Sequence, residues 1–204
     1  MVSSWRGLQI AVVILGVAFA ARAESVPETQ MARDFIVEIS AQIMDLATTE
    51  ESAEARKPLL RKLFRQTLDF DTMSRVAAGK HWQRATPGQR ARYQDVYADY
   101  IVNVYGDRLA RESVEGIDII SSQMVSPDEF LITMNVNRVD HDPLTLGFRL
   151  RKNSDTFKIV DVITEGISLV LTQRTDFSRL LGNSEITVLI DALEKKHQEN
   201  NNKT

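Results

Sequence analysis

The chain offers few side chains suited to acid–base, metal or nucleophilic chemistry. It has three histidines, His81, His141 and His197, and no cysteine. No two histidines have a metal-ligand spacing such as HExxH, and the lack of cysteine excludes thiol catalysis, disulfides and cysteine metal sites. Asp140-His141-Asp142 could ligate a cation, but a polar hairpin turn before Pro143 is the simpler interpretation. The sequence therefore predicts no metal site.

The acidic and serine motifs also have simpler structural interpretations. Asp69-Phe70-Asp71 contains a DxD motif, yet N-capping by Asp71 of a helix over 72–78 explains it. Asp161 lies inside an apolar run, which favours a buried acid that makes structural hydrogen bonds over a catalytic acid. Gly166-Ile167-Ser168-Leu169-Val170 begins like a nucleophile elbow but lacks the second glycine. No catalytic residue is predicted.

The elements that must position these residues fall into three groups. Apolar residues recur at spacings of three and four in the first half, and the capping box Thr86-Pro87-Gly88-Gln89 opens its longest helix. Helices are predicted for 28–48, 54–68, 72–78 and 86–111. From residue 115 the period changes to two, which predicts strands at 115–123, 130–139, 144–152 and 156–164. Two helices are predicted to follow, at 167–181 and 185–197.

This order predicts an α+β fold in which helices pack on a four-stranded antiparallel meander. The fourth strand is apolar on both faces, with Ile159 and Ile163 on one and Val160 and Val162 on the other. A curved sheet with helices across its concave side often encloses an apolar pocket. The sequence does not show whether side chains fill that space.

The N-terminus has the three parts of a secretory signal peptide. Arg6 provides the positive charge, residues 8–21 form a short apolar run, and Ala21-Arg22-Ala23 fits a cleavage site after Ala23. We expect residues 1–23 to be removed, 24–197 to form one domain, and 198–204 to be a disordered polar tail. Removal of 1–23 leaves 23 basic and 28 acidic residues, a net charge of −5. Nucleic acid and anionic membranes are poor partners for such a chain.

Two separated segments carry the strongest signal for function. The first contains Phe70-Asp71-Thr72-Met73-Ser74-Arg75, then Gly79, Trp82 and Thr86-Pro87-Gly88-Gln89-Arg90. The second runs from Phe157 to Val170 and contains Lys158, Asp161, Glu165-Gly166 and Ser168. Together, behind an export signal, they resemble the MlaC family of periplasmic phospholipid-binding proteins, also called toluene-tolerance auxiliary proteins.

The resemblance implies a periplasmic carrier without cofactor or enzymatic activity, and the ordinary, well-charged surface favours a monomer. Such a protein shuttles phospholipid between an outer-membrane lipoprotein complex and an inner-membrane ABC transporter, and so maintains outer-membrane lipid asymmetry. Binding through the acyl chains implies tolerance of the headgroup. The facing of side chains along each element selects these wall residues for the cavity: Met73, Val76, Tyr97, Tyr100, Ile101, Val104, Met134, Val136, Phe148, Leu150, Val160, Val162, Ile167 and Val170.

Two other functions stay open at this stage. One is an isomerase or hydratase on a similar helix-and-sheet cone, with Asp161 as its base, since fold alone does not decide function. The other is carriage of a different apolar lipid, such as a hopanoid or sterol. The absence of a paired acid and base histidine favours carriage over catalysis.

Overall fold

The computed structural model describes residues 27–49, 52–154 and 156–201, so the predicted signal peptide lies outside the described residues. Within these ranges the helices and strands follow one another in the order α1 (Glu28–Thr49), α2 (Ala53–Thr67), α3 (Phe70–Ala78), α4 (Lys80–Arg84), α5 (Pro87–Leu109), β1 (Val114–Ser126), β2 (Glu129–Arg138), β3 (His141–Asn153), β4 (Thr156–Thr164), β5 (Ile167–Ser168), α6 (Leu169–Leu181) and α7 (Ile186–Asn201). None of these helices is long and apolar enough to cross a bilayer.

The local signals for the longest helix are confirmed. The Thr86 hydroxyl accepts from the Gln89 N–H at 3.3 Å, and the Gln89 side chain accepts from the Thr86 N–H at 2.9 Å. Pro87 occupies the first helical position, where its missing N–H costs nothing. The capping box therefore fixes the start of α5.

The predicted cap of α3 was wrong by two residues. Asp69, not Asp71, is the N-cap, because its carboxylate accepts from the Thr72 N–H at 2.9 Å. Asp71 lies in the first turn, where a carboxylate favours the positive end of the helix dipole. Gly79 ends α3 at a positive φ of 56°, and a short unpredicted helix, α4, follows and contains His81.

The sheet is an antiparallel meander of five strands in the order β1-β2-β3-β4-β5, not four. The extra strand, β5, comes from residues predicted to begin the next helix. Ser168 instead caps α6 by accepting from the Leu171 N–H at 3.1 Å, which leaves Ile167 and Ser168 free to pair with β4. A turn with positive φ at Glu165 and Gly166 reverses the chain between the two strands.

Irregular pairing bends the sheet. The register of β1 against β2 shifts at three places, and that of β3 against β4 shifts once, between Arg149 and Leu150. Arg149 pairs with Asp161 and Leu150 pairs with Ile159, so Val160 is the extra residue. Such bulges increase twist and move later side chains to the other face.

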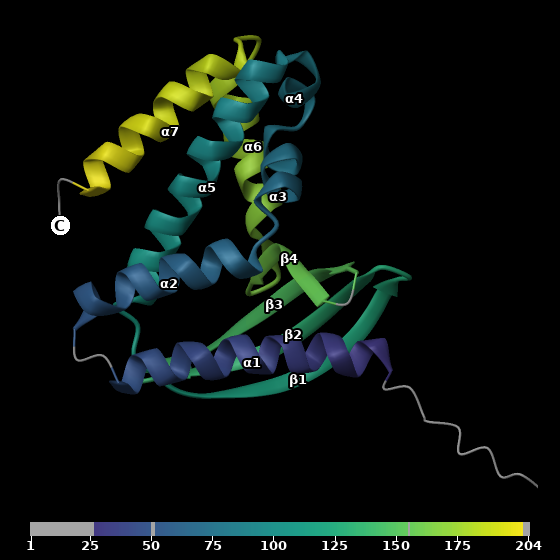
Figure 1. Cartoon of the computed structure of the whole chain (residues 1–204), viewed down its shortest axis with the longest axis vertical. Coiled ribbons are helices and arrows are strands. Elements are labelled where there is room, and N and C mark those ends of the chain that lie inside the picture. The colour runs from purple at the N-terminus through teal and green to yellow at the C-terminus, as the bar shows by residue number, and fades with distance from the viewer. Residues whose placement is uncertain (1–26, 50–51, 155, 202–204) are drawn as a thin grey trace, which may run out of the picture.

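The helices divide into two groups around this sheet (Figure 1). α1 runs along one face of the sheet, and α2 lies next to α1. The remaining helices extend away from the sheet, where α5 packs against α7 and α3 packs against α6. α7 continues to Asn201, through most of the predicted polar tail. We call the first group with the sheet the sheet half, and α3, α4, α6, α7 and the first half of α5 the helical end.

Candidate functional site

An apolar cavity of about 270 Å³ lies in the sheet half. Its walls come from α1, the end of α2, α3, the second half of α5, strands β1 to β4 and the start of α6. The wall residues are mainly aliphatic and include Ile36, Ile39, Ile43, Phe64, Leu68, Met73, Ile101, Tyr105, Leu109, Val114, Ile117, Met134, Val136, Leu144, Leu146, Phe148, Ile159, Val162 and Leu169. The cavity suits a hydrocarbon ligand.

The cavity has a buried end and an open end, which reaches solvent at the wall residue Arg108, whose side chain is 73% exposed. Leu68, Met73 and Ile159 are buried and lie at the buried end, on the side of α3. Its three charged wall residues, Arg108, Glu112 and Arg138, belong to the region where α5 ends and β1 begins. An apolar interior with charged residues near water is the arrangement expected for an amphipathic ligand.

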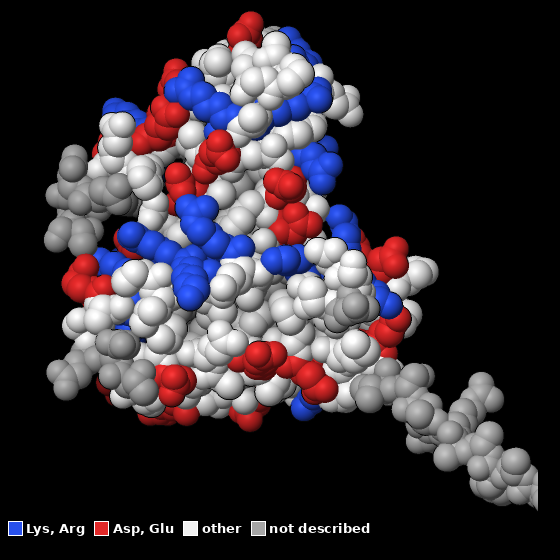
Figure 2. Space-filling model, in the orientation of Figure 1, with Lys and Arg blue, Asp and Glu red and all other residues white. Residues whose placement is uncertain are grey.

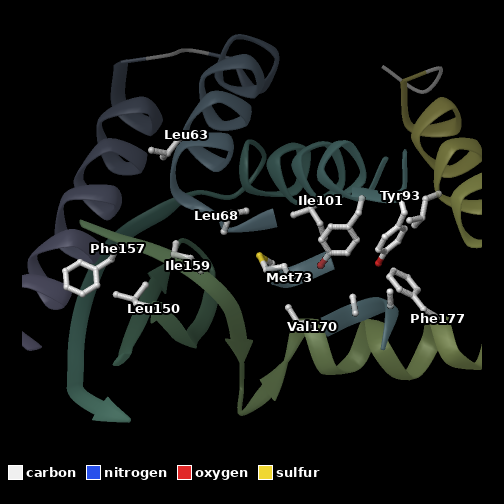
Figure 3. Close-up of a cluster of buried hydrophobic side chains, with 14 of the residues drawn as sticks. Leu63, Leu68, Met73, Tyr93, Ile101, Leu150, Phe157, Ile159, Val170 and Phe177 are labelled. Atoms are coloured by element: carbon white, nitrogen blue, oxygen red, sulfur yellow. The ribbon is translucent and has the colours of Figure 1, made fainter. Parts of the chain in front are cut away.

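One stripe of α5 serves both halves of the molecule. Tyr93 and Tyr97 pack in the helical end, whereas Ile101, Tyr105 and Leu109 from the same stripe line the cavity. Figure 3 shows Tyr93 and Phe177 at one end of the buried cluster, with Ile101 and Met73 between them and the side chains over the sheet. The change from packed core to hollow therefore occurs along a single helix face.

The helical end is filled by aromatic rings and buried hydrogen bonds. The rings of Tyr93 and Tyr97 are 5.8 Å apart, and Phe177 meets Tyr97 edge-on at 6.5 Å. The Tyr97 hydroxyl donates to Gln173 Oε1 at 2.7 Å, and the Tyr93 hydroxyl donates to the Ser74 carbonyl at 3.1 Å. Burial raises the pKa of both tyrosines well above the ordinary value, so both remain neutral donors.

Six of the fourteen residues selected from the sequence line this cavity. They come from α3, α5 and three neighbouring strands, and the structure brings them together around one space: Met73, Ile101, Met134, Val136, Phe148 and Val162.

The other eight lie elsewhere. Tyr97, Leu150, Val160 and Val170 are buried in packed core, and Tyr100 and Val104 are half-buried on α5 beside the stripe. Val76 is 38% exposed and Ile167 is 64% exposed. Two local features explain several of these positions: the bulge at Val160 reverses the facing of β4, and β5 places Ile167 at the outer end of the sheet.

The sequence reasoning missed the contribution of α1 and α2. Ile36, Ile39 and Ile43 from α1, with Phe64 and Leu68 at the end of α2, form much of the wall. The signal was present, because Ile39 and Ile43 belong to the apolar stripe of the first predicted helix. What was lacking was the knowledge that this helix lies across the sheet.

Asp161 has the structural role that the sequence predicted. It is buried, and its two carboxylate oxygens accept from the Ser168 hydroxyl and, at 3.1 Å, from the Val170 N–H. These bonds join β4 to the start of α6. Asp161 is not a wall residue of the cavity, and the described residues contain no group of histidine and carboxylate side chains that could hold a metal.

A second hollow, of about 510 Å³, lies near the start of α3 and is lined mainly by charged residues. Its cations already have partners: Arg151 donates to Glu129 at 2.7 Å, and Lys158 donates to the Gln66 carbonyl. Its polar walls do not suit hydrocarbon, so we assign the apolar cavity as the candidate site.

Charge on the surface is divided between neighbouring helices. α2 contains five basic residues and one acidic residue, and Figure 2 shows basic side chains gathered over it. Acidic side chains follow the lower edge of the same view. Arg61 pairs with Asp107 at 3.0 Å, and Arg65 pairs with Asp99, so part of this basic charge is neutralised locally.

Fold and site together define a protein that binds an apolar or amphipathic ligand in a cavity between a bent sheet and helices. A family model described as MlaC protein matches residues 36–195, and the chain belongs to this family. Among solved structures, it is similar to a phospholipid-binding protein from Ralstonia solanacearum, determined in complex with a phospholipid. That match has a TM-score of 0.67 and 18% identity, and it covers 84% of this chain and 97% of the other. The fold of the two proteins is therefore shared.

Proposed function

We propose that this protein binds phospholipid through its acyl chains in the apolar cavity and carries it through the periplasm. The observation that carries the proposal is the cavity itself, with aliphatic walls, a buried end at Met73 and charged residues only at its open end. Membership of the MlaC family and the phospholipid found with the Ralstonia protein support the same ligand class.

The energetics agree with binding through the tails. Each methylene removed from water contributes roughly 0.8 kcal/mol, so even part of one acyl chain provides a substantial driving force. The cavity volume of about 270 Å³ lies near the lower limit of ligand pockets, which span roughly 300–1,000 Å³. We infer that the walls move apart when a complete lipid enters.

We also propose a cellular role, which membership of the MlaC family supports. The protein is exported by its signal peptide, released after Ala23, and receives lipid at one membrane for delivery at the other. Its partners are an outer-membrane lipoprotein complex and an inner-membrane ABC transporter, and its role is to maintain outer-membrane asymmetry and solvent tolerance. A hydrophobic cavity that reaches the protein surface supports a carrier that exchanges its cargo at the surface of a partner.

Native mass spectrometry of the purified mature protein tests the ligand. We expect a mass increase equal to one phospholipid, with the lipid identified after extraction. A lipid-free protein that takes up nothing from phospholipid vesicles would overturn the proposal. Transfer of labelled phospholipid between two vesicle populations then tests carriage, and an increase in rate proportional to protein concentration is expected.

A further inference from the structure

The charged residues at the open end of the cavity carry charges of both signs, and this bears on which lipid headgroup binds there. Arg108, Glu112 and Arg138 are the charged members of the wall, two cations and one carboxylate. A cavity that bound only hydrocarbon would not need charged wall residues, because charged side chains are normally placed on the outer surface. This set of charges therefore restricts the headgroup chemistry that the open end can match.

Backbone structure brings the three residues to one place. Arg108 is in the last turn of α5, and the Glu112 N–H donates to the Leu109 carbonyl at 3.1 Å, which holds Glu112 close to the end of the helix. Arg138 is opposite Val114 in the β1–β2 ladder, two residues beyond Glu112. Cross-strand neighbours have Cβ atoms about 5 Å apart, so the cations and the carboxylate border the same opening.

All three side chains remain available to a ligand. Arg138 uses Nε and Nη2 to donate to the Asp142 carbonyl, at 3.2 and 2.7 Å, and its Nη1 has no hydrogen-bond partner in the described part of the chain. Arg108 and Glu112 are 3.9 Å apart, and the Arg108 side chain is 73% exposed. A long, exposed ion pair of this kind is weak and easily replaced.

We propose, on the basis of the phospholipid binding inferred above, that the open end selects a zwitterionic headgroup that carries a primary ammonium beside its phosphodiester. Arg108 and Arg138 bind the phosphodiester, since guanidinium groups match phosphate oxygens with two donors. Glu112 binds the ammonium, which offers three N–H donors to a carboxylate. An anionic headgroup without an amine meets the arginines but leaves Glu112 unpaired. This selectivity departs from the headgroup tolerance expected from binding through the tails alone.

The test uses lipid-free mature protein incubated with equimolar vesicles of phosphatidylethanolamine and phosphatidylglycerol that have identical acyl chains. Bound lipid is quantified after re-purification. We expect phosphatidylethanolamine to be enriched roughly two- to fivefold in the wild type. Glu112→Gln should lose the enrichment and bind phosphatidylethanolamine and phosphatidylglycerol in the proportion of the vesicles. Glu115→Gln is the matched control, because Glu115 is exposed, three residues away and outside the cavity wall.

A second comparison tests the arginines against the complete headgroup. Vesicles that contain phosphatidylethanolamine and diacylglycerol with the same chains offer two ligands that differ in the headgroup. Arg138→Gln should lower the preference for the phospholipid, whereas Arg111→Gln, at an exposed residue outside the wall, should not. Melting temperatures of all variants establish that each remains folded.

The outcomes separate this inference from the proposed function. Bound lipid whose composition follows that of the vesicles, in the wild type and in every variant, would overturn headgroup selection and leave lipid carriage intact. An equal loss of preference in Glu115→Gln would overturn the assignment to Glu112. If no lipid of any class is bound, both the selection and the carriage are refuted.

Discussion

The helical end and the sheet half use apolar side chains for opposite purposes. In the helical end, Tyr93, Tyr97 and Phe177 fill the space between helices, and tyrosine hydroxyls find buried partners. In the sheet half, isoleucine, leucine and valine side chains surround a hollow of about 270 Å³. A single stripe of α5 continues from one to the other.

This difference indicates how a small protein keeps a cavity without losing its stability. Empty apolar space costs free energy because its walls lack packing partners. The helical end contributes the close packing that the sheet half lacks, and it anchors one end of α5. The packed helical end therefore stabilises the helix that forms part of the cavity wall. The wall residues themselves can then serve binding and need not pack closely.

The largest expected effect is on stability in the helical end. Tyr97→Ala removes a fully buried ring and leaves Gln173 Oε1 without its donor, so we expect a loss of about 3–5 kcal/mol in the free energy of unfolding. Phe148→Ala on the cavity wall should cost only about 1–2 kcal/mol, because its ring is partly exposed and faces the hollow. Urea denaturation of lipid-free protein measures both.

Equal losses in these two variants would break the comparison, because they would mean that the cavity is as closely packed as the helical end. Tyr97→Phe provides a finer control. It keeps the ring and removes the hydroxyl, and it should fall between the wild type and Tyr97→Ala.

The second prediction concerns binding. Val162→Glu places a carboxylate on the cavity wall, where it must either lose hydration or keep water in the path of the acyl chain. We expect lipid occupancy to fall at least about tenfold, equivalent to about 1.4 kcal/mol. Ile167→Glu is the matched control on the neighbouring strand, and it should leave occupancy unchanged because Ile167 is exposed and outside the wall.

Native mass spectrometry after incubation with vesicles compares the two variants. Loss of lipid in Ile167→Glu and its retention in Val162→Glu would place the binding site beside β5 instead. That result would also restore the cavity wall expected from the sequence, in which Ile167 was a member.

The third prediction addresses the joint between the two halves. Asp161→Asn replaces a carboxylate that accepts from Ser168 and Val170 and ties β4 to α6. Hydrogen bonds to a charged group are stronger than neutral ones, so we expect a loss of about 1–2 kcal/mol in the free energy of unfolding. Lipid transfer between vesicles should continue. Complete loss of transfer in a folded Asp161→Asn protein would instead favour the enzyme interpretation.

The sequence predicted the order and type of most elements because their signals are local. The Thr86 capping box, Gly79 and the alternation in the third strand depend only on neighbouring residues. The number of strands was missed because Ile167 and Ser168 are apolar and polar in an order that fits either a strand or a helix start. Their pairing with β4 depends on the turn at Glu165 and Gly166.

The cavity wall was harder to predict because it depends on register and layer order. The expectation for β4 put Ile159 and Val162 on opposite faces, yet both line the cavity. The bulge at Val160 accounts for this, and a bulge leaves no reliable mark in a run of β-branched residues. The places of Ile39 and Phe64 on the wall depend on how α1 and α2 cross the sheet, which no local pattern specifies.

The smallest expected effects are those of low pH on the free energy of unfolding, and they should occur over different pH ranges in the two halves. In the helical end, burial lowers the pKa of His81 below its ordinary value of 6.5, and the nearby charges of Lys80 and Arg84 add to the effect. The unfolded chain then binds the proton first, so stability should decrease as pH falls through about 6.5 toward the folded pKa. His81→Gln should remove this decline, whereas the exposed His141→Gln should not.

In the sheet half, stability should decrease over a lower pH range. The hydrogen bond from Arg151, with a smaller contribution from Arg149, lowers the pKa of Glu129 below its ordinary value of 4.5. Its contribution to stability is complete above that value and is lost as pH falls through the folded pKa, because the unfolded state again binds the proton first. Denaturation curves of wild type, His81→Gln and Glu129→Gln over this range should separate the two windows. A single pH window that both substitutions remove would contradict the assignment of one window to His81 and the other to Glu129.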